Sequence, residues 1–140
     1  MNLLLLIFLS VIFGNSGPKE TVDMQITITN INSIKGNVEI GLFNNSNTFL
    51  QKGKEYKSVS KKVTNDTVIV IFKSIPKDQY AISVYHDKNA DKQCNLNFFG
   101  IPTEQYGFSK NFKPKLSKPE FNDCKIDAQQ NQSIVIKLLD

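Results

Sequence analysis

The 140-residue sequence contains no arginine and no tryptophan, and it has a single histidine, His86. All 17 of its basic side chains are therefore lysines, and 13 acidic side chains leave a net charge of +4. Arginine is the residue that forms paired hydrogen bonds with phosphates and guanine edges. Lysines scattered among acidic residues are typical of a solvated surface, so we expect no nucleic-acid partner.

Common catalytic motifs are also missing, including G-x-S-x-G, H-E-x-x-H and a phosphate-binding loop. His86 and Asp87 are neighbours at the end of a predicted strand, where successive side chains point to opposite faces, so they do not readily form a relay. Asp87 and Glu104 are a carboxylate pair of the kind used in glycoside hydrolysis, but the sequence does not set their separation. The sequence predicts a non-enzymatic protein, with a hydrolase as the alternative.

Long apolar runs are absent except at the N terminus, where Leu3–Phe13 is interrupted only by Ser10. This run is too short to span a bilayer comfortably, and the small residues that follow it are typical of a cleavage site. The pattern predicts a signal peptide over residues 1–17, a single domain over residues 18–140 and a secreted or periplasmic location. Because the leader carries no lysine or arginine, an uncleaved anchor is the alternative.

Only two cysteines occur, Cys94 and Cys124. An even count in an oxidising compartment favours a disulfide. The bridge would close a loop of about 31 residues and contribute about 3–4 kcal/mol of chain-entropy stabilisation. Two unpaired thiols are the alternative.

No segment shows a sustained helical period, and short apolar or alternating segments separated by turn residues fill the chain instead. The predicted strands cover residues 23–31, 37–43, 56–63, 67–72, 81–85, 120–126 and 133–139. The lysine-rich segment 56–63 is typical of an edge strand, and Tyr80 after Ile75-Pro76 is typical of a tyrosine corner. About seven strands predict an all-β fold, an immunoglobulin-like or transthyretin-like β-sandwich.

The segment Tyr85–Asn111 is a long connection in which several oxygen-bearing side chains alternate along the chain. Four of them form a weak candidate calcium site: Asp87, Asn89, Asp91 and Asn95. Lys92 stands where such loops need glycine, and Phe98 stands where they need a bidentate glutamate. An asparagine- and aspartate-rich turn, whose side chains bond to their own backbone, is therefore the alternative, and no cofactor other than calcium is expected.

The second half of this segment concentrates apolar rings between Gly100, Pro102 and Gly107. One interpretation is a lid that buries Phe98, Phe99, Tyr106 and Phe108 over the end of the sandwich. The other is an exposed aromatic platform suited to a glycan or a peptide. The candidate ligand-binding residues are His86, Asp87, Asn89, Asp91, Glu104, Tyr106 and Phe108.

These residues carry a family resemblance. The motif H-D-x-N at His86–Asn89, followed by N-F-x-G-I-P-x-E-x-Y-G-F-S at Asn97–Ser109, resembles the signature of an exported bacterial family catalogued as domain of unknown function 2141. The resemblance implies an exported β-sandwich without an assigned activity. Members commonly read H-D-x-N-x-N/D-G-x-L-D in the loop, and this chain differs at Ala90, Lys92, Cys94 and Asn95, which weakens the case for cation binding.

The sequence thus predicts an exported binding or accessory module that uses the loop of residues 85–111. Its partner would be a glycan, a peptide or an envelope protein, and no membrane span is expected after cleavage of the leader. A purely structural, envelope-associated protein is the first alternative, and a weak calcium-binding domain or a hydrolase is the second.

Overall fold

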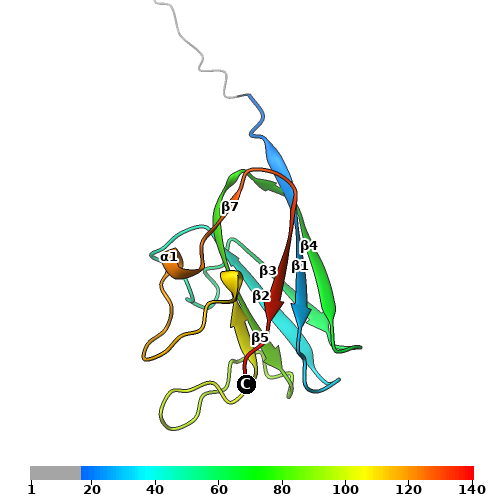
Figure 1. Cartoon of the computed structure of the whole chain (residues 1–140), viewed down its shortest axis with the longest axis vertical. Helices are drawn as coiled ribbons and strands as arrows, with labels where there is room; N and C mark the ends of the chain where they lie inside the picture. Colours follow the sequence, from blue (N-terminus) through cyan, green and yellow to red (C-terminus); the bar gives the residue numbers. More distant parts are fainter. Residues whose placement is uncertain (1–16) are drawn as a thin grey trace, which may run out of the picture.

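Apolar alternation along the chain produces two packed β-sheets in the computed structural model, which describes residues 17–140 (Figure 1). The first sheet has the strand order β4-β1-β8 and the second has the order β3-β2-β5-β6, with β7 also paired to β5. The prediction of an all-β sandwich is confirmed, with eight strands instead of about seven. The predicted signal peptide, apart from Gly17, lies outside the described residues.

The strands are β1 (Thr21–Thr29), β2 (Asn37–Phe43), β3 (Lys57–Lys62), β4 (Val68–Pro76), β5 (Asp78–Asp87), β6 (Tyr106–Phe108), β7 (Ile126–Ala128) and β8 (Gln132–Lys137). Two short helical turns, η1 (Ser109–Asn111) and α1 (Phe121–Cys124), interrupt them late in the chain. Strand β1 pairs antiparallel with β4 and parallel with β8, so the first and last strands lie side by side. The lysine-rich strand β3 pairs only with β2, as predicted for an edge strand.

The main core lies between the two sheets and follows the alternation directly. Met24, Ile26 and Ile28 of β1 are fully buried and face the second sheet, to which Val38 and Ile40 of β2 belong. Tyr80 is also fully buried, and its hydroxyl donates a hydrogen bond to the carbonyl of Pro76 at 2.8 Å. The predicted tyrosine corner is therefore present.

A second core cluster covers the other face of the second sheet. It is formed by Phe43, Ala81, Phe108, Phe121 and Cys124. As a result β5 is buried on both faces over much of its length. The strand predicted over residues 120–126 is wrong here, because α1 occupies most of that segment, and the backbone amide of Glu120 donates to the Asp123 carboxylate at 2.8 Å to cap the turn.

Among residues 17–140, no helix has the length and hydropathy needed to cross a membrane.

Candidate functional site

The connection between β5 and β6 projects from one end of the sandwich, at the lower left of Figure 1. Together with the end of β5 and with β6 it makes up the segment of residues 86–109, which contains every candidate residue proposed from the sequence except Cys124. The structure divides it into a base, residues 86–92 and 104–109, and a tip, residues 95–103. The two parts differ in burial and in chemistry.

His86 ends the row of core-facing residues on β5 and is fully buried. Its Nε2 atom lies 2.7 Å from the carbonyl oxygen of Lys35, which accepts a hydrogen bond from the ring. The Nδ1 atom is buried and has no hydrogen-bond partner among the described residues. Because a carbonyl oxygen can only accept a hydrogen bond, the proton is on Nε2. The His86 side chain therefore links β5 to the loop between β1 and β2.

Asp87 follows on the opposite face of β5 and is also fully buried. Its two carboxylate oxygens accept hydrogen bonds from the backbone amides of Asp91 at 3.1 Å and Lys92 at 2.8 Å. Lys92 has a φ of 59°, so it adopts the left-handed conformation that the glycine of the family motif would take more readily. Asp87 therefore fixes the turn at residues 91 and 92, whereas the His86 side chain bonds to the β1–β2 loop.

Asp91 lies at the centre of the predicted calcium site, but its neighbours present nitrogen to it. The side-chain amide groups of Asn89 and Asn95 donate to one Asp91 oxygen at 3.0 and 3.2 Å, and the backbone amide of Gln93 donates to the other at 2.9 Å. A cation would need oxygens at these positions. In the described part of the chain, no group of three His, Cys, Asp or Glu side chains is arranged to hold a metal ion. In this structure the side chains of Asp87, Asn89, Asp91 and Asn95 make hydrogen bonds within an aspartate- and asparagine-rich turn, which is the arrangement that the alternative interpretation predicts.

Glu104 is buried at the other side of the base. Its carboxylate accepts hydrogen bonds from the backbone amides of Lys88 at 3.0 Å and Asn95 at 3.4 Å. The two carboxylates, Asp87 and Glu104, thus each hold two backbone amides of the same loop. Both carboxylates are buried and accept hydrogen bonds from the backbone of their own loop.

Two buried polar residues of the base were missed by sequence reasoning. The Gln105 side chain accepts from the Asn32 amide at 2.9 Å and donates to the Asn30 carbonyl at 2.8 Å and to Asp140 at 2.9 Å. The buried Ser109 hydroxyl accepts from the Ile82 amide at 2.9 Å. Both residues lie within the loop motif, but their partners are 15 to 75 positions away, so no local pattern identified them.

The aromatic residues of the loop are divided between the two parts. Phe108 is buried in the second core cluster, and Tyr106 is partly buried with its ring 5.9 Å from that of Phe108. Phe98 and Phe99 are 96% and 83% exposed, and their rings meet edge to face with centroids 5.6 Å apart. The lid interpretation is therefore right for Phe108 and wrong for Phe98 and Phe99.

The tip is a small β-hairpin, residues 95–103, which we call the aromatic hairpin. An isolated antiparallel bridge closes it. The Asn97 side-chain oxygen accepts from the backbone amides of Phe99 at 2.9 Å and Ile101 at 3.0 Å, and the Asn97 carbonyl accepts from Gly100 at 2.9 Å. These bonds hold the two exposed rings in a defined place without contacts to the sandwich core.

The predicted disulfide is absent, because Cys94 and Cys124 are both free thiols. Cys124, the last residue of α1, is fully buried in the second core cluster, whereas Cys94 is half-buried in the loop. Burial, with a contribution from Asp123, raises the pKa of Cys124 to about 12. Burial also raises the pKa of Cys94, and Glu104 adds to the rise while Lys118 opposes it. The two thiols thus occupy separate environments, which spacing in the sequence does not reveal.

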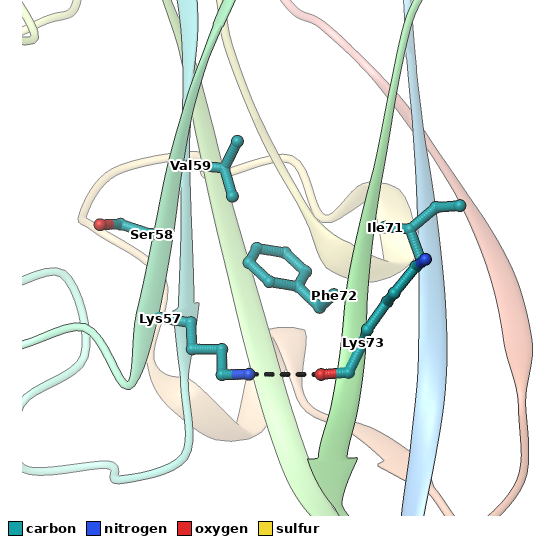
Figure 2. A pocket seen from close by; sticks show the side chains of 6 residues that line it. All are labelled: Lys57, Ser58, Val59, Ile71, Phe72 and Lys73. Atoms are coloured by element: carbon teal, nitrogen blue, oxygen red, sulfur yellow. Dashed lines mark hydrogen bonds between the residues drawn. The ribbon is translucent and has the colours of Figure 1, made fainter.

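A groove of about 420 Å³ lies elsewhere, between the edge strands β3 and β4. Its lining residues are Lys57, Ser58, Val59, Ile71, Phe72 and Lys73 (Figure 2). The Lys57 ammonium donates to the carbonyl of Lys73 at 3.3 Å and so links the two sheets across this open edge. Phe72 points into the space between the strands and Ile71 points away from it (Figure 2). Its lining contains apolar side chains, two lysines and Ser58, and the groove is the open edge between the two sheets of the sandwich.

Comparison with known proteins finds the same family that the loop motif resembles. The family model described as "Uncharacterized protein conserved in bacteria (DUF2141)" matches residues 26–136, a range that includes the end of β1, all of strands β2 to β7, most of β8 and the whole β5–β6 connection. No curated protein and no solved structure matches the chain. The family resemblance predicted from the H-D-x-N and G-I-P-x-E-x-Y-G-F-S motifs is confirmed. The chain belongs to the DUF2141 family of bacterial proteins.

Proposed function

We propose that this protein is an exported, non-catalytic binding module whose contact surface is the aromatic hairpin. The observation that carries the proposal is the near-complete exposure of Phe98 and Phe99 on a hairpin that is itself well braced. Apolar rings in solvent are costly, and contiguous exposed apolar surface commonly marks an interaction site. The hairpin adds nothing to either core cluster, so folding does not account for these rings.

The base of the loop supports this role by holding the hairpin in place. Asp87 and Glu104 each hold two backbone amides, and Gln105 ties the loop to the β1–β2 connection. A contact surface on a rigid support loses little conformational entropy on binding. The candidate contact residues are therefore Phe98 and Phe99 at the tip, in place of the polar residues at the base.

The same hydrogen bonds support a non-catalytic role. A general acid or base needs a carboxylate that can reach a substrate proton. Those of Asp87 and Glu104 face backbone amides of their own loop, and the His86 ring faces the carbonyl of Lys35. The polar residues that suggested a hydrolase have structural partners.

Export is supported by the apolar run Leu3–Phe13 and the small residues after it. Expression of the full chain in a bacterium, followed by fractionation and intact-mass measurement, tests this part. We expect the product in the exported fraction, shortened by about 17 residues. A full-length product in the cytoplasm would contradict it.

The binding role is tested by site-specific photo-crosslinking in living bacteria. A benzophenone amino acid replaces Phe98 in one variant and Ile69, an exposed residue on the outer face of β4, in the control. We expect a discrete crosslinked species from position 98 and none of the same mass from position 69. Equal or absent crosslinking at both positions would favour the purely structural alternative, in which only the buried base of the loop matters.

A further inference from the structure

We infer that the aromatic hairpin inserts into the surface of a lipid bilayer that carries anionic headgroups. The inference rests on the proposed function and names the partner of the same surface. Four observations lead to it: the chemistry of the tip, the saturation of its backbone, its shape, and the charges that surround it.

The large exposed side chains of the tip are all hydrocarbon. Phe98 and Phe99 are almost completely exposed, and Leu96 and Ile101 beside them are each about half exposed. None of these four side chains has a hydrogen-bonding atom. Sugars and peptides are recognised by apolar contacts together with a few precise polar groups, and the exposed rings of this tip supply only the first.

The backbone of the tip is largely satisfied within the hairpin. The amides of Asn97, Phe99, Gly100 and Ile101 all donate to acceptors between residues 97 and 101. Transfer of an unpaired amide into an apolar phase is strongly unfavourable. A hairpin that has already paired these amides can enter the acyl boundary of a membrane without leaving them unsatisfied.

The hairpin projects from the end of the sandwich (Figure 1). A projecting tip cannot enclose a small molecule, but it can enter a soft apolar layer. Aromatic and aliphatic side chains that penetrate the headgroup boundary are the usual anchors of proteins that lie on a membrane.

Lysines lie beside the segment that leads into the hairpin, where they would meet the headgroups. Lys92 is exposed in the loop, and the ammonium of exposed Lys52 donates to the Lys92 carbonyl at 2.7 Å. Exposed Lys118, from the segment before α1, lies close enough to Cys94 to lower its pKa against the stronger effect of burial. Among the carboxylates of the loop, Asp87 and Glu104 are buried and Asp91 is exposed. The excess of exposed positive charge complements an anionic bilayer.

The absence of tryptophan from the sequence provides a direct test. In the full chain, Phe98→Trp introduces a single fluorophore at the tip, and Ile69→Trp introduces one on the outer face of β4 as the control. Each is mixed with vesicles of equal parts phosphatidylglycerol and phosphatidylethanolamine, with and without brominated acyl chains. Because the reporter is specific to its position, binding through the apolar N-terminal run does not imitate insertion of the hairpin.

We expect the emission of the Phe98→Trp variant to shift to the blue and to be quenched by brominated chains, while the Ile69→Trp variant shows neither effect. An unshifted, unquenched Phe98→Trp variant would overturn the inference. Quenching of equal strength at position 69 would also overturn it, because the contact would then not be made by the hairpin.

Two double variants separate lipid insertion from specific recognition, with cosedimentation of the exported product as the readout. Phe98→Ser with Phe99→Ser should weaken vesicle binding at least about tenfold, and Phe98→Leu with Phe99→Leu should retain most of it, since insertion needs apolar surface and not aromatic shape. If the leucine pair binds as weakly as the serine pair, the tip recognises something other than lipid.

The charge contribution is tested by Lys92→Gln and Lys118→Gln, each expected to weaken binding to anionic vesicles about fivefold. Vesicles of phosphatidylcholine alone should bind the native protein less tightly, and equal binding would contradict the role of the lysines. If position 98 crosslinks to a protein in cells and the Phe98→Trp variant ignores vesicles, the lipid inference fails while the binding function stands. If position 98 gives no specific crosslink in cells and the Phe98→Trp variant does not respond to vesicles, both the binding function and the lipid inference are contradicted.

Discussion

The base and the tip of the β5–β6 connection differ in what surrounds their side chains. At the base, the polar side chains of Asp87, Glu104 and Gln105 are buried, and each of these three accepts a hydrogen bond from a backbone amide. At the tip, Phe98 and Phe99 are exposed and touch mainly each other. The ordinary distribution of polar and apolar residues is therefore reversed within one loop.

The comparison shows that polarity alone does not locate a functional surface. Buried carboxylates are tolerated because backbone amides replace the water that they lose. Exposed rings are tolerated in a rigid hairpin because a network of amides around Asn97 holds its shape without them. The base thus contributes to stability and the tip is free to contribute to contact, and four experiments test this division.

The largest effect is expected at Gly36, which approaches the base most closely. Gly36 has a φ of 64°, and a Cβ atom there would lie 2.0 Å from the backbone oxygen of Asp87. Gly36→Ala should lower the free energy of unfolding by about 4 kcal/mol or prevent folding, measured by urea denaturation. Gly53→Ala is the matched control, because Gly53 has a φ of 79° and open space around it, and should cost about 1 kcal/mol. Equal losses in both variants would contradict the close approach.

The next effect compares two phenylalanines of the same loop. Phe108→Ala removes a buried ring from the second core cluster and should lower the free energy of unfolding by about 3 kcal/mol. Phe98→Ala removes an exposed ring and should change it by less than about 0.5 kcal/mol. Thermal and urea unfolding of both variants give the comparison directly. A large loss in Phe98→Ala would mean that the tip packs on the sandwich in solution.

A smaller loss is expected from the carboxylate of the base. Asp87→Ala leaves the amides of Asp91 and Lys92 without their acceptor and should lower the free energy of unfolding by about 2 kcal/mol. Asp91→Ala, which removes an exposed carboxylate of the same loop, should cost less than about 1 kcal/mol. Equal stability of the two variants would contradict the structure, in which Asp87 is buried and Asp91 is exposed.

The smallest effect on stability is expected at the tip itself. Asn97→Ala removes the side-chain oxygen that accepts from Phe99 and Ile101 and should leave the free energy of unfolding within about 0.5 kcal/mol of the native value. Amide hydrogen exchange of those two residues should accelerate about tenfold. The Gly100 amide, which donates to the Asn97 backbone carbonyl, is the internal control and should change less. Unchanged exchange at Phe99 and Ile101 would show that the brace does not order the hairpin.

Much of this architecture follows from the sequence, because strand alternation and turn chemistry are local. Met24, Ile26 and Ile28 alternate on one face whatever the partner strand, and Tyr80 after Ile75-Pro76 predicts its own hydrogen bond. The family motif is local as well, since it lies within residues 86–109. The position of the candidate site in this loop was predictable for the same reason.

The assignment of roles within the loop was decided only by tertiary structure. The burial of Asp87 and Glu104, the exposure of Phe98 and Phe99, and the separate environments of Cys94 and Cys124 depend on which segments pack against which. A one-dimensional pattern contains the residue types but not their distant neighbours, such as the Lys35 carbonyl at His86. The sequence by itself therefore determined the β-sandwich, its family and the location of the loop. Packing of the loop base against the β1–β2 connection and the second core cluster decided which of its side chains support the fold and which face solvent.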